Sequence, residues 1–188
     1  MSRPQRAAPV TDVAARRAAV TRAGGVDGRQ MGTAAHRLIA ELLEVGVREP
    51  TPLFILEHVA RHPVLQGRAV LYRQAAKQTL ASALAVYFRY FAPAERWRLL
   101  GSEVAVGSCR FDLLFDVGGV IVADELKSGR LDGADAWQAL ERQLERELCG
   151  GRERWGDAFG GVRVLVLGAP RRSFLAAPEG TREPLPCK

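Results

Sequence analysis

The stretch CRFDLLFDVGGVIVADELK, which spans Cys109 to Lys127, decides the fold of this chain. Alternation over Cys109–Val117 is typical of a strand and predicts one shared face for Cys109, Phe111, Leu113 and Phe115. Gly118-Gly119 predicts a tight two-residue turn, because glycine accepts the positive φ angles that such turns need. Val120–Lys127 is then a second strand, so the stretch predicts an antiparallel hairpin.

Three charged residues of this hairpin indicate a chemical function. A period of two puts Glu125 and Lys127 on one face, and the short turn brings Asp112 close to Glu125. Ionised carboxylates among valines and leucines are costly unless a cation compensates them. Two carboxylates with water suit Mg²⁺ or Mn²⁺, and a lysine beside them can orient water or offset phosphate charge. The pattern predicts metal-assisted hydrolysis of a phosphodiester.

Helices precede the hairpin. Apolar residues at helical spacing predict a first helix over Thr33–Val47. Proline at its first turn favours a second helix over Pro52–Arg61, and a longer one over Gln66–Phe91 stops at Ala92-Pro93. Arg98–Val106 then predicts a strand that enters the hairpin.

A helix and a strand follow the hairpin. Turn-forming residues predict a loop over Ser128–Ala134, and Asp135 is a plausible N-cap for a helix to Cys149 that Gly150-Gly151 ends. Val162–Leu167 is almost wholly apolar, which is typical of a strand covered on both sides. The chain therefore reads as helices followed by β-β-β-α-β, a mixed α/β fold.

Length and composition bound the organisation of the chain. Its 188 residues suit one domain, with a loose N-terminal arm over 1–28, a patterned body over 29–175 and a C-terminal tail over 176–188. The formal charge of +6 favours polyanions such as nucleic acid, although 24 of the 27 basic residues are arginine, a bias that a GC-rich genome also produces.

Several classes of protein are excluded. No apolar run reaches the ~18 residues of a membrane span, and the first residues lack the apolar core of a secretory signal. The three cysteines have neither disulfide nor zinc spacing, and there is no phosphate loop of the ATPase type. These features predict a cytoplasmic protein without an ATP motor of its own.

The hairpin resembles the PD-(D/E)XK nuclease superfamily, whose restriction-endonuclease-like core has the order α-β-β-β-α-β. Asp112 matches the acid of its second strand, and Glu125-Leu126-Lys127 matches the (Asp/Glu)-x-Lys of its third. Gly107 to Phe115 is similar to the Gly-x-x-Asp strand of the RecB-like branch. The resemblance implies a Mg²⁺- or Mn²⁺-dependent deoxyribonuclease, with Asp112 and Glu125 on the metal and Lys127 at the attacking water.

Two helical motifs extend this resemblance. Gly32-Thr33-Ala34-Ala35-His36-Arg37-Leu38 is similar to the branch's G-T-x-x-H helix, which implies His36 as a metal ligand. Gln143-Leu144 is similar to the start of its Q-L-x-x-Y motif, which implies a catalytic role for Gln143. The motif's tyrosine is absent, and Gln138 is a rival for the glutamine.

The remaining predictions concern the surroundings of the site. Glu103 lies on the strand before Asp112, where related enzymes carry acids that are sometimes near the metal, and a plain surface role is equally compatible. Arg130 and Arg146 are the candidates for DNA contact. The expected partners are single- or double-stranded DNA and a helicase or another protein of a defence, repair or recombination system. The alternative is a non-catalytic nucleic-acid-binding or assembly subunit with the same fold.

Overall fold

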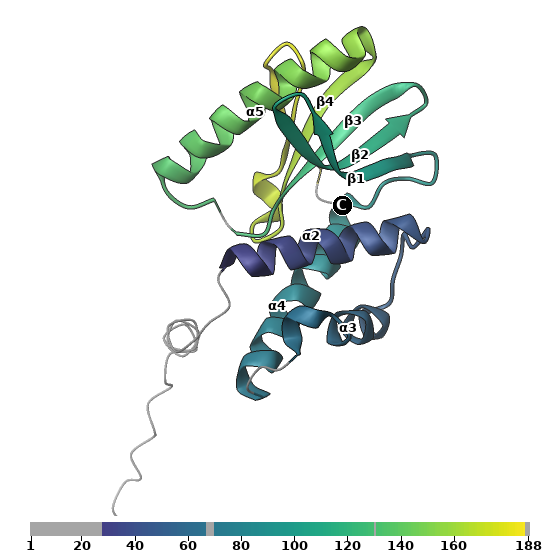
Figure 1. Cartoon of the computed structure of the whole chain (residues 1–188), viewed down its shortest axis with the longest axis vertical. Coiled ribbons are helices and arrows are strands. Elements are labelled where there is room, and N and C mark those ends of the chain that lie inside the picture. Colours follow the sequence, from purple (N-terminus) through teal and green to yellow (C-terminus); the bar gives the residue numbers. More distant parts are fainter. Residues whose placement is uncertain (1–27, 67–69, 130, 187–188) are drawn as a thin grey trace, which may run out of the picture.

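A six-stranded mixed sheet separates two groups of helices in the computed structural model, which describes residues 28–66, 70–129 and 131–186 (Figure 1). The strands lie in chain order, and every neighbouring pair is antiparallel except β3 and β4, which are parallel. Their bounds are β1 Arg98–Val106, β2 Cys109–Val117, β3 Val120–Lys127, β4 Phe159–Val166, β5 Phe174–Ala176 and β6 Arg182–Pro184.

Helices cover both faces of this sheet. One face packs against α2 (Gly28–Glu44) and the helices behind it, α3 (Pro52–Ala60) and α4 (Val70–Val86). The other face packs against α5 (Ala134–Trp155). The predicted order of helices followed by β-β-β-α-β is confirmed, and the strand that follows α5 is covered on both sides as its apolar sequence predicts.

The long helix before β1 is divided. We predicted one helix over Gln66–Phe91, whereas the structure has α4 and then a π-helical turn over Tyr87–Phe91, with residues 67–69 outside the described part. This turn places Tyr87, Phe88 and Phe91 in the core. Short 3-10 turns follow α3, α5 and β4 at Pro63–Leu65, Gly156–Ala158 and Pro170–Arg172.

The hairpin between β2 and β3 is confirmed. Val117 pairs with Val120, and Gly118 and Gly119 have φ angles of 67° and 93°, which a side chain would strain. The Asp116 side chain accepts a hydrogen bond from the Gly119 N–H at 2.7 Å, the turn role that its position suggests. Asp124 points to the face opposite Glu125, as the two-residue period of a strand requires.

The predicted faces of β2 are partly wrong. Cys109 and Phe111 pack in the core under α5, whereas Leu113 and Phe115 pack in the core under α2 and α4. Alternation therefore breaks at Asp112. The neighbouring strand β1 is also irregular, because Glu103 adopts a φ of 53°. This left-handed conformation is rare for residues other than glycine.

The predicted ends of α5 are also wrong. The helix does not stop at Gly150-Gly151 but continues to Trp155, and its N-cap position is Gly133 rather than Asp135. A Cβ atom on Gly150 would lie 2.7 Å from the Cys109 Sγ, and one on Gly151 would lie 2.4 Å from the Phe159 ring. The two glycines therefore serve close packing of the helix on the sheet.

The structure describes most of the predicted C-terminal tail and only the last residue of the predicted N-terminal arm. The predicted tail over 176–188 instead contains the end of β5 and the strand β6. A turn between these strands closes a hairpin in which Ala176 pairs with Arg182. The predicted N-terminal arm lies outside the described residues, apart from Gly28. Among the helices of the described residues, none has the length and apolar character of a membrane span.

Candidate active site

A cleft of about 700 Å³ opens between α2, the strands β1 to β3 and α5. Its lining carries more negative than positive side chains. Six carboxylates line it (Glu41, Glu44, Glu103, Asp112, Glu125 and Glu147) beside three guanidinium groups (Arg37, Arg110 and Arg146). Such an excess of carboxylates favours the binding of a cation.

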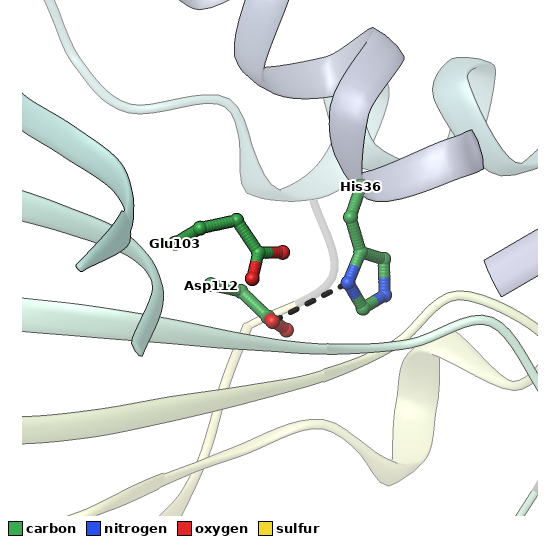
Figure 2. A group of neighbouring side chains, drawn as sticks. All are labelled: His36, Glu103 and Asp112. Carbon is green, nitrogen blue, oxygen red and sulfur yellow. Dashed lines mark ion pairs between the residues drawn. The ribbon is translucent and has the colours of Figure 1, made fainter. Parts of the chain in front are cut away.

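His36, Glu103 and Asp112 meet in this cleft (Figure 2). One donor atom from each lies within 4.8 Å of the other two, and the His36 Nδ1 is 3.3 Å from an Asp112 carboxylate oxygen. His36 comes from α2, which can approach the strands because Gly32 lies where a Cβ atom would be 3.1 Å from the Ser128 Oγ. The predicted metal ligands His36 and Asp112 and the possible ligand Glu103 are thus brought together.

The Asp112 carboxylate is fixed from two sides. Its Oδ2 accepts a hydrogen bond from the Leu126 N–H at 2.7 Å, while its Oδ1 faces His36. Ser102 pairs with Leu113 and Val104 pairs with Phe111, so Glu103 lies opposite Asp112. At this position the alternation of side chains between the two faces of the sheet is interrupted in both strands. An unusual backbone conformation of this kind is often retained where a side chain must point into a functional site.

Glu125, which is buried, and Lys127, which is half-buried, form an ion pair next to this group. The Lys127 Nζ lies 2.6 Å from the Glu125 Oε1 and donates to the Gln143 Oε1 at 2.8 Å. Glu125 lines the cleft, but it is not a member of the group that His36, Glu103 and Asp112 form. The second glutamic oxygen, Oε2, is buried and finds no hydrogen-bond partner within the described part of the chain.

Glu147 is a residue of the cleft that the sequence reasoning missed. Its Oε1 accepts a hydrogen bond from the Gln143 Nε2 at 2.6 Å, and its side chain is buried. Counting Q-L-x-x-Y from Gln143 puts the last position of the motif at Glu147, so the motif itself could have drawn attention to it. Gln143, rather than its rival Gln138, is the glutamine that contacts Lys127.

The acids and the histidine influence one another electrostatically. Burial opposes the charged form of His36, but the hydrogen bond and charge of Asp112, with Glu125 and Glu103, raise its pKa above the usual value. Burial and the charge of Asp112 raise the pKa of Glu125, against the opposing effect of Lys127. Burial and the charge of Glu125 raise the pKa of Glu147 to about 8.

A second buried ion pair lies on the opposite face of β3. Arg163 donates two hydrogen bonds to Asp124, at 2.6 and 2.7 Å, and its guanidinium lies over the Trp97 ring. The Tyr87 hydroxyl donates to the same carboxylate at 3.2 Å. The Asp124 carboxylate lies in the core, and neither Asp124, Arg163 nor Tyr87 lines the cleft.

The two arginines predicted to contact DNA have different outcomes. Arg146 is exposed on α5 and lines the cleft. Arg130 lies outside the described residues. Arg110, which the sequence reasoning did not select, also lines the cleft and pairs with Glu103 at 2.8 Å.

Comparisons with known proteins leave the family of the chain open. No protein-family model matches the chain, and no curated protein matches it. A solved structure described as "Structure of EndoMS-dsDNA2 complex" aligns with 38% of this chain and 27% of that chain, at 29% identity and a TM-score of 0.28. The chain thus spans well under two thirds of that protein, and so low a structural similarity supports no inference here.

Proposed function

We propose that the chain is a divalent-metal-dependent nuclease of the PD-(D/E)XK superfamily and its RecB-like branch, which hydrolyses phosphodiester bonds in DNA. One observation carries the proposal. Asp112 and the Glu125–Lys127 pair, which come from adjacent strands, line or border the same cleft as His36 and Glu103.

The donor set fits a divalent cation. His36, Glu103 and Asp112 offer one nitrogen and two carboxylate donors, a combination that suits Mn²⁺ and, with water in the remaining positions, Mg²⁺. These three residues would hold the ion. Glu125, which the family resemblance also implies as a ligand, has a buried oxygen with no hydrogen-bond partner among the described residues. When bound, the ion would polarise the phosphate and lower the pKa of its water.

The residues around that position have distinct roles in the proposed reaction. Lys127 orients the attacking water and offsets the charge that develops on the phosphate, because its ammonium is held at a fixed place by Glu125 and Gln143. Gln143 is a positioning residue, since its amide contacts Lys127 on one side and Glu147 on the other. The hydrogen bond from the Leu126 N–H to Asp112 restricts the orientation of the Asp112 carboxylate.

Positively charged arginine side chains at the cleft attract the DNA backbone. Arg146 and Arg110 line the cleft, and both can contact backbone phosphates without reading sequence. The metal also offsets the excess of carboxylates, so we expect DNA to bind more tightly when the metal is present. A cytoplasmic location and recruitment by a helicase or another protein of a DNA-processing system complete the proposal.

Metal-dependent cleavage tests the proposal directly. Labelled single- and double-stranded DNA, with RNA in parallel, is incubated with the wild type and with Asp112→Asn in Mg²⁺, Mn²⁺ or EDTA. We expect cleavage of DNA by the wild type with either metal and none in EDTA or by Asp112→Asn. Asp116→Asn, an acid on the same strand that caps the turn, is the matched control and should cleave normally. Absence of cleavage by the wild type under broad conditions, with DNA still bound, supports the non-catalytic subunit instead.

A further inference from the structure

Lys127 and Glu147 contact opposite ends of the Gln143 side-chain amide. The amide oxygen, Oε1, accepts a hydrogen bond from the Lys127 Nζ at 2.8 Å, and the amide nitrogen, Nε2, donates to the Glu147 Oε1 at 2.6 Å. Gln143 and Glu147 are four residues apart on α5, so both side chains lie on the same face of this helix. The amide therefore links Lys127 on β3 with Glu147 on α5.

The chemistry of its two neighbours determines which way this amide points. An ammonium group only donates hydrogen bonds, so Lys127 meets the amide oxygen and not the NH₂ group. The NH₂ group then needs an acceptor on its other side, and Glu147 supplies one there. A protonated glutamic acid keeps a carbonyl oxygen that accepts, so this contact does not require an ionised side chain.

Burial makes the contact with Glu147 important for the place of Gln143. Glu147 is 1% exposed and Gln143 is half-buried, and both side chains line the cleft. A buried NH₂ group without an acceptor is costly, so without Glu147 the Gln143 amide would turn toward water in the cleft. Lys127 would then keep Glu125 alone as its partner among the described residues.

We propose that Glu147 is a positioning residue, which holds the Gln143 amide oxygen against Lys127 and thereby fixes the place of the Lys127 ammonium. The consequence for catalysis rests on the proposed function, in which Lys127 orients the attacking water. Among the described residues, the contacts with Glu125 and Gln143 use two of the three N–H groups of the ammonium, which leaves the third for a water molecule or a phosphate oxygen. Position 147 is where the resembled motif has a tyrosine, so the resemblance assigns no role to this glutamate.

Lysine NMR tests the inference without reference to cleavage, because the chain contains only three lysines. Chain labelled with ¹³C-lysine is studied in EDTA at about pH 6, well below the pKa of about 8 for Glu147, so that a change at this position removes no charge. The Lys127 signal is identified by its absence in Lys127→Ala. We expect this signal to move in Glu147→Met and to stay in place in Glu147→Gln, which keeps a carbonyl oxygen at the same length.

A second background separates positioning from a general effect on the fold. Gln143→Met has no amide to hold, so adding Glu147→Met to it should cause little further movement of the Lys127 signal. If the signal moves equally in both backgrounds, or does not move in Glu147→Met at all, the inference is wrong. Glu145→Gln, at an exposed acid on the same helix, is the matched control and should leave the signal unchanged.

Hydrogen exchange in the wild type keeps the inference testable if Glu147→Met does not fold. The NH₂ protons of Gln143, identified by their absence in Gln143→Met, should exchange more slowly than those of Gln138, which is exposed on the same helix. Equal exchange rates at the two glutamines would show that Glu147 does not hold the amide.

Cleavage extends the test to the proposed reaction. With saturating Mn²⁺, Glu147→Met should lower the single-turnover rate on the order of tenfold, and Glu147→Gln should stay within about threefold of the wild type. The decrease should vanish in the Gln143→Met background. If NMR gives the expected result and the wild type cuts no DNA, only the proposed function fails. If the wild type cuts DNA, but Glu147→Met changes neither the rate nor the Lys127 signal, only this inference fails.

Discussion

Asp124 and Glu125 are neighbours on β3, yet their carboxylates lie in opposite environments. Asp124 is 0% exposed and accepts hydrogen bonds from Arg163 and Tyr87, so both of its oxygens are satisfied. Glu125 is almost as deeply buried, but only one of its oxygens is paired, with Lys127, and the other has no partner in the described part of the chain.

The difference between these neighbours shows that burial alone does not distinguish a structural acid from a functional one. Arg163 also donates to the Phe91 carbonyl oxygen and lies over Trp97, so the Asp124 pair connects the sheet with the end of the helical group. The group around Glu125 faces a cleft and retains unused hydrogen-bonding capacity. Unused capacity in a cleft is the feature that indicates a ligand.

Breaking the satisfied pair should give the largest change in stability. Arg163→Ala leaves Asp124 buried without its cation, and such losses typically cost about 3–5 kcal/mol. Urea unfolding should show this decrease in the free energy of unfolding. Arg171→Ala, at an exposed arginine, should change it by no more than about 0.5 kcal/mol. Equal losses in the two variants would show that the Asp124 pair contributes no more than surface charge.

The incompletely satisfied group should make stability depend on pH. The pKa of Glu147 is about 8 in the folded chain and 4.5 when unperturbed, so the folded chain holds an extra proton between these values. Stability should therefore fall as pH rises through this window, by on the order of a few kcal/mol. Urea unfolding in EDTA at about pH 5 and about pH 8 measures this slope.

Glu147→Gln sharpens the same measurement. The amide cannot ionise, so the variant should lose much of the decrease between the two pH values, while Glu145→Gln should keep it. If the free energy of unfolding changed equally with pH in the wild type and in Glu147→Gln, other groups would cause the pH dependence. Glu147 would then not explain the difference between the two faces of β3.

Mn²⁺ should stabilise the cleft and leave the opposite face unaffected. At a concentration a hundredfold above Kd, a ligand that binds only the folded chain adds about 2.7 kcal/mol per site. Thermal melting with and without Mn²⁺ should show this gain in Asp116→Asn and a smaller gain in Asp112→Asn. The gain should persist in Arg163→Ala, from a lower starting stability, because that pair lies outside the cleft. If Mn²⁺ gave no gain in the stability of Arg163→Ala, the two faces of the sheet would be energetically coupled.

The smallest expected effect concerns the rim of the cleft. Arg146→Ala removes one exposed cation from the lining, so DNA affinity should fall by a similar modest factor for all sequences, and the salt dependence of binding should decrease by about one phosphate contact. Binding is measured by fluorescence anisotropy across salt concentrations in a Lys127→Ala background, with Arg171→Ala as the control. A sequence-selective loss would instead indicate contact with bases.

Local rules predicted the parts of the fold that depend on near neighbours. The glycine turn at Gly118-Gly119, the strands beside it and the face shared by Glu125 and Lys127 follow from periodicity and turn chemistry. Gly150-Gly151 was misread as a helix end because the close approach of Cys109 and Phe159, which lie far away in sequence, is a tertiary property.

For the site, too, the sequence predicted some of the residues but not the features that depend on packing. Asp112, His36 and Gln143 were found from motif spacing, and the structure brings each of them to the cleft. The left-handed backbone of Glu103 and the unpaired oxygen of Glu147 depend on which groups surround them after folding. Spacing identifies a residue that can be a ligand, whereas only the packed structure shows which of its atoms is left without a partner.

Single-turnover cleavage by Lys127→Ala tests the proposed chemistry most directly. DNA is labelled, the chain is in excess and Mn²⁺ is saturating, so the rate reports the chemical step. We expect the rate to fall on the order of 10²- to 10⁴-fold relative to the wild type, the usual range for a positioned proton-transfer or electrostatic group, while the variant stays folded and still binds DNA. A rate within about twofold of the wild type would contradict the role of Lys127 and with it the nuclease assignment of this cleft.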